Sequence, residues 1–304
     1  MLRAFVSDAV DAGWEVVATW DRRLSIPDEL RQSGLELISV DDVEAERVRF
    51  AELCRAADAA YVIAPELDGE LLRRVTAAQA LNHRCLNASI SAVDLCGDKW
   101  EFFRHCRQGG LPTIETELLR GSSDSQLDWP RVAKLRFGAG SQRMQLLTPD
   151  LEWPQCDQTD RHSELLLQPY VSGFAISVAA LVGPDQRYEL FPVADQFISP
   201  QRSFEYSGGR VPSQWDSAVV RQLAGRVMES IPGLSGYVGI DLLIPDSNPT
   251  QPIVVEVNPR LTTSYIGYRT LCQENIVRHW LDTRPEPLSW RPNAITFDSQ
   301  GMIQ

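Results

Sequence analysis

The stretch that decides the fold is residues 236–260, GYVGIDLLIPDSNPTQPIVVEVNPR. Two apolar runs flank PDSNPTQP, a segment dense in turn-forming residues, so the runs are predicted to pair as an antiparallel hairpin. A loop centred between Asn248 and Pro249 places Asp241 directly opposite Glu256. The hairpin therefore carries two carboxylates side by side in a mostly apolar setting.

Side chains of a strand alternate between its two faces, so Glu256 and Asn258 share one face with Val254. The other face carries Ile253, Val255 and Val257. Two facing carboxylates repel each other and lose hydration, unless a cation lies between them. Hard oxygen ligands of this kind are typical of Mg²⁺, so Asp241, Glu256 and Asn258 are predicted to hold one or two ions.

The alternative for any single strand carboxylate is a solvated position beside an arginine, which is the usual place for acidic residues. For Asp241 or Glu256 taken alone, that alternative would be preferred. The grouping of both with Asn258, followed by Pro259 and Arg260, favours the metal site.

Composition excludes several classes of partner. The 304 residues carry 29 basic and 41 acidic side chains, a net charge of -12, which is the wrong sign for binding nucleic-acid phosphates or anionic lipid. The six cysteines are dispersed without metal-binding spacing, so we expect free thiols and a cytoplasmic protein. No signal peptide or membrane span is predicted, and a homodimer is left open.

Helix and strand patterns alternate through the first ~90 residues, which predicts an α/β domain with a parallel sheet over residues 1–92. Its first pattern is helical, whereas such domains normally begin with a buried strand, which leaves open whether a first strand is missing. Residues 93–168 form a second block, with a helix around 94–110 and two strands joined by a Gly-rich turn within 129–147. Residues 169–304 are richer in strands and predict an α+β part.

Lysine is rare in this chain. Of the 29 basic residues only Lys99 and Lys134 are lysines, and the other 27 are arginines. A compact, flexible ammonium suits a phosphate oxygen that moves during a reaction, so the two lysines are candidates for phosphate contacts. Lys134 is followed by FGAGS, which alone would be an ordinary turn.

Four motifs in order resemble the ATP-grasp superfamily, with residues 1–92 resembling its pre-ATP-grasp domain. They are Asp98-Lys99 followed by GLPT, Lys134 with FGAGS, LLLQPYVSGFAISV, and E-x-N-P-R at 256–260 with Asp241 upstream. The resemblance implies a small lobe over 93–168, a large lobe over 169–304, and binding of ATP with Mg²⁺. It does not extend to two positions, because Pro169 and Ala175 stand where many relatives have an acid for adenine and one for ribose.

The resemblance also implies a role for each site residue. Lys99 and Lys134 would contact phosphates, and Arg260 would stabilise the transferring phosphoryl group. The lid over the phosphates would be formed by Gly138, Gly140 and Ser141. The adenine linker would be formed by Gln168, Pro169, Tyr170 and Val171. The implied activity is ligation of a carboxylate to an amine through an acylphosphate.

Two further segments, FEYSGGRVP (204–212) and LTTSYIGYR (261–269), are candidates for substrate binding. Arg210 or Arg269 could clamp a carboxylate, and Tyr206, Tyr265 or Tyr268 could line an aromatic pocket. The remaining candidates are Gly208, Gly209, Thr262 and Thr263. Together with GWEVVATWDRR, these segments are similar to the tyramine–glutamate ligase branch, which implies L-glutamate and a tyramine-like or tyrosine-like amine as small-molecule substrates.

Three alternatives remain open at this stage. The segments 204–212 and 261–269 are equally compatible with ordinary surface turns. A ligase for another amino acid or dipeptide, of the D-alanine or carnosine type, has the same motifs. A non-catalytic ATP-binding module would be favoured by loss of a metal ligand or a phosphate lysine, and neither loss is seen.

Overall fold

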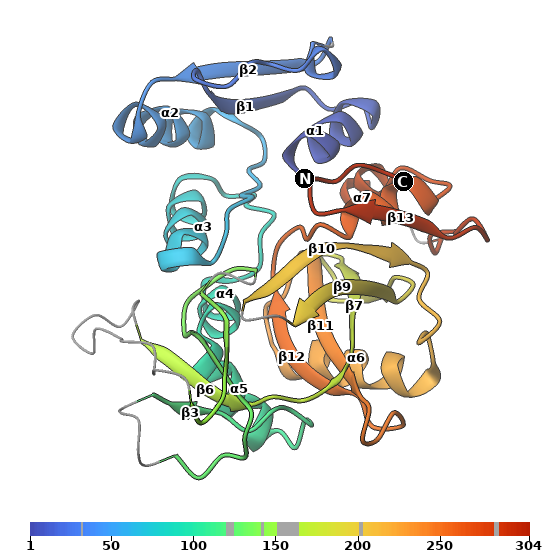
Figure 1. The fold of residues 1–304 in the computed structure, drawn as a ribbon. Coiled ribbons are helices and arrows are strands. Elements are labelled where there is room, and N and C mark those ends of the chain that lie inside the picture. Colours follow the sequence, from blue (N-terminus) through green and yellow to red (C-terminus); the bar gives the residue numbers. More distant parts are fainter. Residues whose placement is uncertain (32, 120–124, 141–142, 151–163, 201–202, 283–285) are drawn as a thin grey trace.

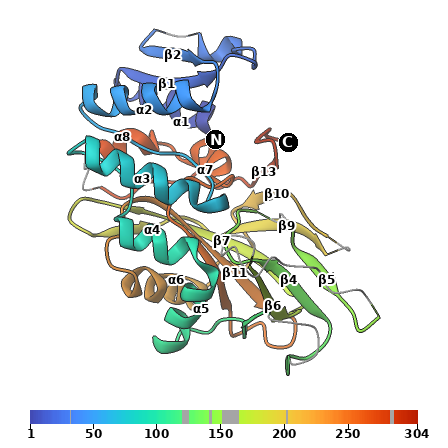
Figure 2. The same cartoon turned by 90° about the vertical axis from the view of Figure 1, so that its left-hand side faces the viewer.

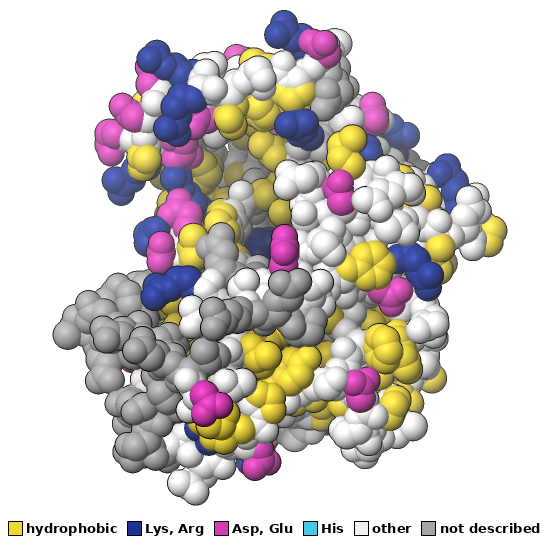
Figure 3. Space-filling view, in the orientation of Figure 1, with side chains coloured by type: hydrophobic (Ala, Val, Ile, Leu, Met, Phe, Trp, Pro, Cys, Tyr) yellow, Lys and Arg dark blue, Asp and Glu magenta, His cyan; other side chains and the backbone are white. Residues whose placement is uncertain are grey.

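The computed structural model describes residues 1–304 except 32, 120–124, 141–142, 151–163, 201–202 and 283–285. The first part confirms the predicted α/β alternation, with two parallel strands covered by helices. Its elements are α1 (Leu2–Asp11), β1 (Val16–Asp21), the short η1 (Asp28–Leu30), β2 (Leu35–Val40), α2 (Val43–Ala56), η2 (Leu67–Gly69) and α3 (Glu70–Leu81). Acidic and basic side chains crowd the surface of this part, where α2 and α3 carry many exposed ion pairs (Figure 3).

The helix predicted around 94–110 is in fact two helices, α4 (Ile90–Gly97) and α5 (Lys99–Gln108). Asp98 has extended backbone angles between them and accepts hydrogen bonds from the amides of Trp100 and Glu101. The prediction of one helix was wrong because an aspartate that caps α5 also ends α4. As a result Lys99 stands at the first position of α5.

A four-stranded sheet follows, in the order β3-β6-β4-β5. Its strands are β3 (Glu117–Leu118), β4 (Arg131–Leu135), β5 (Gln145–Leu147) and β6 (Leu165–Pro169). The two strands predicted within 129–147 are β4 and β5, which pair antiparallel. Part of the turn that joins them, residues 141–142, lies outside the described residues.

The largest sheet has seven strands in the order β12-β11-β7-β9-β10-β13, with β8 paired to β7. They are β7 (Gly173–Val182), β8 (Tyr188–Leu190), β9 (Ala194–Pro200), β10 (Phe204–Val211), β11 (Gly236–Pro245), β12 (Ile253–Asn258) and β13 (Ile295–Asp298). The helices of this part are α6 (Ala218–Ser230), α7 (Tyr265–Leu271) and α8 (Ile276–Leu281). Helices α4, α5 and α6 lie along one face of the sheet, and the four-stranded sheet stands opposite the other (Figures 1 and 2).

One apolar core joins these parts. Its buried side chains come from α3, α4, α5 and α6 and from the helix-facing side of β7, β11 and β12. Leu71 and Val75 of α3 belong to the same cluster as Ile240 of β11 and Val254 of β12. Helix α3 of the N-terminal part therefore packs into the core of the large sheet, while Val6, Trp20 and Leu30 form a smaller core around β1 and β2.

The hairpin of β11 and β12 confirms the predicted pairing of Asp241 with Glu256, but a β-bulge produces it. Nearer the loop, Leu242 pairs with Val254, and without the bulge Asp241 would face Val255. The bulge also changes the predicted faces, because Val254 joins Val257 in the helix-side core while Val255 lines the same cavity as Glu256. The assignment of Val254 to the face of Glu256 was therefore wrong.

Within the described residues, the helices are all too short or too polar to cross a membrane. The five cysteines in that part of the chain, Cys54, Cys85, Cys96, Cys106 and Cys272, are free thiols.

Candidate active site

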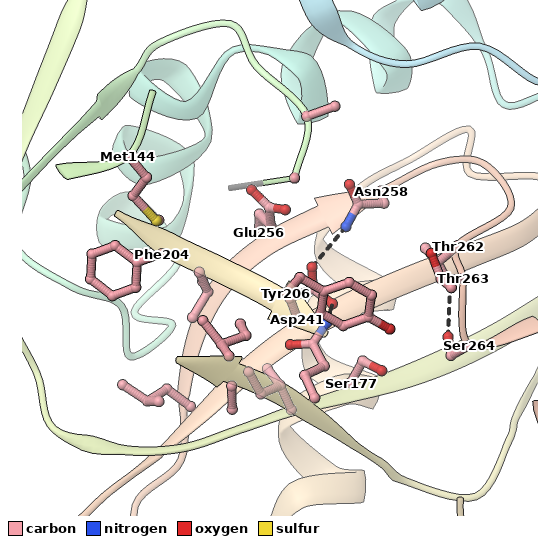
Figure 4. Close-up of a pocket in the computed structure, with 18 of the residues that line it drawn as sticks. Met144, Ser177, Phe204, Tyr206, Asp241, Glu256, Asn258, Thr262, Thr263 and Ser264 are labelled. Carbon is pink, nitrogen blue, oxygen red and sulfur yellow. Dashed lines mark hydrogen bonds between the residues drawn. The ribbon is translucent and has the colours of Figure 1, made fainter. Parts of the chain in front are cut away.

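A cavity of about 1220 Å³ lies between the two sheets and is the candidate active site. Its walls come from the four-stranded sheet on one side and from β7, β9, β10, β11 and β12 on the other. Residues 63–65 of the N-terminal part and residues 262–264 also line the cavity. Figure 4 shows Glu256, Asp241 and Asn258 from neighbouring strands pointing into this space together with Tyr206.

The predicted trio of oxygen-bearing side chains is brought together. Asp241 accepts hydrogen bonds from the amide of Asn258 at 3.0 Å and from the amide of Gln196 at 2.9 Å. Because the amide N–H of Asn258 donates to Asp241, its carbonyl oxygen points the other way and accepts only a long contact, 3.5 Å from Nη2 of Arg260. Gln196 lies on β9 and holds the carboxylate of Asp241 from the opposite side.

The pKa values of the two carboxylates are shifted in opposite directions. Burial, followed by the negative charge of Glu256, raises the pKa of Asp241 well above its usual value. Burial alone would also raise the pKa of Glu256, but the charges of Lys99 and Lys134 outweigh it and bring that pKa to about 2. Two adjacent buried carboxylates repel each other when both are ionised. A divalent cation between them would remove this repulsion and allow both to carry a negative charge.

The donor set fits Mg²⁺ in its chemistry, since it supplies two carboxylates and one amide oxygen. In the part of the chain that the structure describes, His, Cys, Asp and Glu side chains form no group of three that could hold a metal. Asn258 therefore has to complete the ligand set, which is the composition that the sequence predicted.

Both lysines reach the cavity, but they lie in different surroundings. Lys99 donates to the carbonyl oxygen of Gly138 at 2.7 Å and forms an ion pair with Glu256 at 3.0 Å. Lys134, near the end of β4, is 5% exposed, and burial together with the charge of Lys99 lowers its pKa to about 8. Among the described residues, no ion pair joins Lys134 to a carboxylate, so its charge lacks a direct counterion.

The neighbour of Lys99 has a structural role. Asp98 is 1% exposed and receives both Nε and Nη2 of Arg136 at 2.7 and 2.6 Å. This fork joins the start of α5 to the end of β4, so the Asp98–Arg136 pair fixes the distance between the two lysine-bearing elements. In the Asp98-Lys99 motif only the lysine faces the cavity.

The predicted lid and linker positions also line the cavity. Gly138 and Gly140 are on its wall, and Gly140 has a φ of 62°, a left-handed conformation that favours glycine. Ser141, predicted as part of the same lid, lies outside the described residues. The linker positions that face the cavity are Gln168, Pro169, Tyr170 and Val171.

Arg260 lies beside the trio formed by the two carboxylates and Asn258, which is called the carboxylate trio below, and its side chain is 11% exposed. Its guanidinium binds the carboxylate of Glu66 with Nε at 2.7 Å and Nη2 at 2.5 Å. Glu66 precedes η2 in the N-terminal part and is itself 5% exposed. Burial would lower the pKa of Arg260, but the charge of Glu66 outweighs it and the pKa is raised.

The structure divides the predicted substrate residues into two groups. Tyr206, Arg210, Thr262 and Thr263 line the cavity. Burial raises the pKa of Tyr206, so its phenol stays protonated at neutral pH and can donate a hydrogen bond. Arg210 lies 3.4 Å from Asp195, its partner across β9 and β10.

The other predicted substrate residues do not reach the cavity. Tyr265 and Arg269 both bind the buried carboxylate of Asp8 in α1, at 2.6 Å for the phenol. Tyr268 donates to the carbonyl oxygen of Pro192. The structure thus gives these three side chains packing partners and no place on the cavity wall, because α7 turns this face toward α1 and the large sheet. Asp8 lies 261 residues before Arg269 in the sequence.

Gly208 and Gly209 are also structural. They lie where β10 pairs with β9 on one side and with β13 on the other. A Cβ on Gly209 would come within 2.4 Å of the carbonyl oxygen of Asp195. Glycine is needed there for the close approach of two backbones. The two glycines thus shape the wall without lining the cavity.

Sequence reasoning missed Glu66, Gln196 and Ser177. Glu66 and Gln196 hold Arg260 and Asp241, and no local pattern marks such long-range partners. Ser177 is opposite Asp241 on β7, is 4% exposed and lines the cavity, yet its hydroxyl has no hydrogen-bond partner among the described residues. A serine inside the apolar run FAISVAALV was the one available signal.

Comparison with known protein families gives two adjoining matches. Residues 96–264 match the family described as ATP-grasp domain, and residues 14–93 match the pre ATP-grasp 3 domain. The first match covers more than half of the chain and contains both lysines, the carboxylate trio and Arg260.

Individual relatives are more distant. The tyramine–L-glutamate ligase of Methanocaldococcus fervens is 29% identical over 107 residues, which are 34% of this chain and 33% of that protein. An ATP-grasp superfamily protein of Archaeoglobus fulgidus has a similar fold, with a TM-score of 0.69 at 24% identity over 98% of this chain and 84% of its own. The ADP complex of N5-carboxyaminoimidazole synthetase from Staphylococcus aureus has a TM-score of 0.73 at 17% identity, over 97% and 78% of the two chains.

Proposed function

The chain belongs to the ATP-grasp family, and from this premise we propose that it is an ATP-dependent ligase that joins a carboxylate to an amine. The observation that carries the proposal is the convergence of Lys99, Lys134, Asp241, Glu256 and Asn258 on one cavity. Two adjacent buried carboxylates cost free energy without a cation, so their presence favours a site that binds a divalent cation together with the nucleotide phosphates.

In the proposed reaction, the substrate carboxylate attacks the γ-phosphate of ATP to give an acylphosphate and ADP. The amine then attacks the acyl carbon, and phosphate leaves through a tetrahedral intermediate. Such chemistry depends mostly on positioning and on neutralising charge, so no covalent nucleophile from the protein is required.

The residues divide this work. Asp241, Glu256 and Asn258 would hold Mg²⁺, which when bound neutralises phosphate charge. Lys99 and Lys134 would contact the non-bridging oxygens, and Arg260 would stabilise the transferring phosphoryl group. Gly138 and Gly140 would cover the phosphates, and residues 168–171 would bind adenine through the backbone.

For the substrates we propose L-glutamate and an aromatic amine such as tyramine. The support is the similarity to tyramine–L-glutamate ligases, although the matched region spans only a third of the length of these curated relatives. Tyr206, Arg210, Thr262 and Thr263 would form the acceptor end of the cavity. Arg210 is the candidate to clamp a carboxylate bidentately, since its contact with Asp195 is loose at 3.4 Å.

Further features of the proposal concern the whole molecule. The working division is 1–92, 93–168 and 169–304, for the pre-ATP-grasp domain, the small lobe and the large lobe. A methanofuran-like one-carbon pathway in the cytoplasm would be the setting in which a γ-glutamyl amide is used. A homodimer is the oligomer that we propose.

The experiment is ADP release from MgATP, measured against a panel of amino acids and amines with and without L-glutamate. Release that requires both L-glutamate and tyramine supports the full proposal. Stimulation by D-alanine or by a dipeptide precursor, and not by L-glutamate, would replace the glutamate assignment with another ligase specificity. Binding of ATP without stimulation by any pair would leave a nucleotide-binding module and overturn the ligase.

A further inference from the structure

The contact between Glu66 and Arg260 joins segments that are 194 residues apart. Glu66 lies just before η2, and Arg260 follows β12 directly after the carboxylate trio. Both side chains are largely buried, with 5% and 11% of their surface exposed. A buried ion pair of this kind is rarely a device for stability, because desolvation of both charges offsets most of their attraction.

The hydrogen bonds of Arg260 show which part of its guanidinium stays available. Glu66 takes the edge formed by Nε and Nη2, and the carbonyl oxygen of Leu261 takes one N–H of Nη1 at 3.0 Å. The second N–H of Nη2 lies 3.5 Å from the amide oxygen of Asn258, which is at the limit of a hydrogen bond. The outer edge, between Nη1 and Nη2, is therefore the part left for an anion in the cavity.

The same contacts continue into the metal-binding trio. Asn258 donates to Asp241, and Asp241 is held from β9 by Gln196. Glu66 thus ends a chain of contacts that runs from the N-terminal part through Arg260 to the carboxylate trio. A change in the orientation of Arg260 would reach Asn258 as well.

We propose that Glu66 is a positioning residue, which holds the guanidinium of Arg260 edge-on so that its outer edge faces the transferring phosphoryl group. This inference rests on the proposed ligase function, and it gives the N-terminal part of the chain a direct role in the reaction. Glu66 itself touches no reacting atom.

A second carboxylate–guanidinium fork between the same two parts of the chain provides a control. Asp8 of α1 binds Nε and Nη2 of Arg269 at 2.8 and 2.6 Å, nearly the same geometry, although the Arg269 side chain is 32% exposed and Asp8 also binds Tyr265. Neither Asp8 nor Arg269 lines the cavity. Asp8→Asn therefore removes an equivalent structural contact while leaving Arg260 untouched.

The test compares Glu66→Gln, Arg260→Gln, the double variant and Asp8→Asn by steady-state kinetics and thermal denaturation. Glu66→Gln is expected to lower kcat by about 10- to 100-fold while the KM for ATP changes less than about threefold, because misplacement by ~1 Å costs about that much. In the Arg260→Gln background, Glu66→Gln should lower kcat no further. Asp8→Asn should lower Tm but change kcat less than about twofold.

Thermal denaturation gives a readout that needs no activity. Each single variant leaves one buried charge without its partner and should lower Tm, and the double variant should recover part of the loss. If Glu66→Gln lowers Tm as Asp8→Asn does and leaves kcat unchanged, the pair is only structural and the inference is overturned. If the wild type turns over no substrate pair at all, the ligase proposal fails instead. The Tm values of the two single variants and the double variant would then still show whether Glu66 and Arg260 stabilise each other's charge.

Discussion

Replacement of Lys134 by methionine is expected to stabilise the nucleotide-free protein, although it removes a residue of the candidate active site. Burial and the charge of Lys99 lower the pKa of Lys134 from 10.5 to about 8, so the folded protein disfavours this charge by about 3 kcal/mol at neutral pH. Methionine fills the same space with a flexible apolar chain and carries no charge. At ~2 °C per kcal/mol for a chain of this size, Tm should rise by about 6 °C.

Lys99→Met is the matched control, and its expected sign is opposite. Lys99 forms an ion pair with Glu256 at 3.0 Å, in which the two side chains are 13% and 19% exposed. Its removal leaves the buried carboxylate of Glu256 with Lys134 as its remaining nearby cation, which should cost roughly 3 kcal/mol, the low end for a broken buried pair. Both variants should lose the stabilisation that MgATP gives to the wild type, since both lysines are proposed to contact phosphate.

The assay is thermal denaturation at pH 7, followed by circular dichroism, with and without MgATP. The change with pH in the stability difference between the wild type and Lys134→Met gives a second test. Between about pH 8 and pH 10.5 the unfolded chain keeps the proton of Lys134 while the folded protein releases it, so wild-type stability rises relative to Lys134→Met. The gap between the two proteins should therefore narrow over this window. A lower Tm for Lys134→Met without nucleotide would refute the reasoning, because it would mean that the site stabilises the charge.

Three further predictions concern activity. Glu256→Ala should abolish ADP release while circular dichroism shows an intact fold, and ligase activity in that variant would rule out the metal assignment. Lys134→Arg should lower kcat by about 100-fold or more despite keeping the charge, because a planar guanidinium does not fit the buried position of a lysine on β4; kinetics close to wild type would show that only charge matters there. Arg210→Gln should raise the KM for the carboxylate substrate by about tenfold or more, with the KM for ATP as the internal control; an unchanged KM would exclude it as the carboxylate clamp.

The sequence predicted the central hairpin well because its information is local. Turn formers between two apolar runs determine the pairing, and the chemistry of Asp241, Glu256 and Asn258 is visible within 18 residues. The β-bulge could not be read, since the alternation of Val254 and Val255 looks regular. The prediction that Asp241 faces Glu256 was correct for a compensating reason. The loop is centred slightly earlier in the sequence than we assumed, and the extra residue of the bulge, Val255, restores the predicted register beyond it.

The substrate candidates that do not reach the cavity differ from the prediction for a non-local reason. Tyr265 and Arg269 have the right chemistry and lie close to Arg260 in sequence, but Asp8 binds both from the far end of the chain. Glu66 was missed for the same reason, since nothing in its neighbourhood marks it as the partner of Arg260. A side chain's chemistry can be read from the sequence, whereas the competitor for its hydrogen bonds is supplied by tertiary packing.

The shared apolar core has a consequence for how this protein can be divided. The match to the ATP-grasp domain begins at residue 96, yet Leu71 and Val75 pack in one cluster with Ile240 and Val254. A fragment that starts at the family boundary would expose this surface to water and should aggregate. Co-expression of residues 1–88 and 89–304, cut in the segment between α3 and α4, should instead restore a folded complex, because the two chains together cover the shared core again.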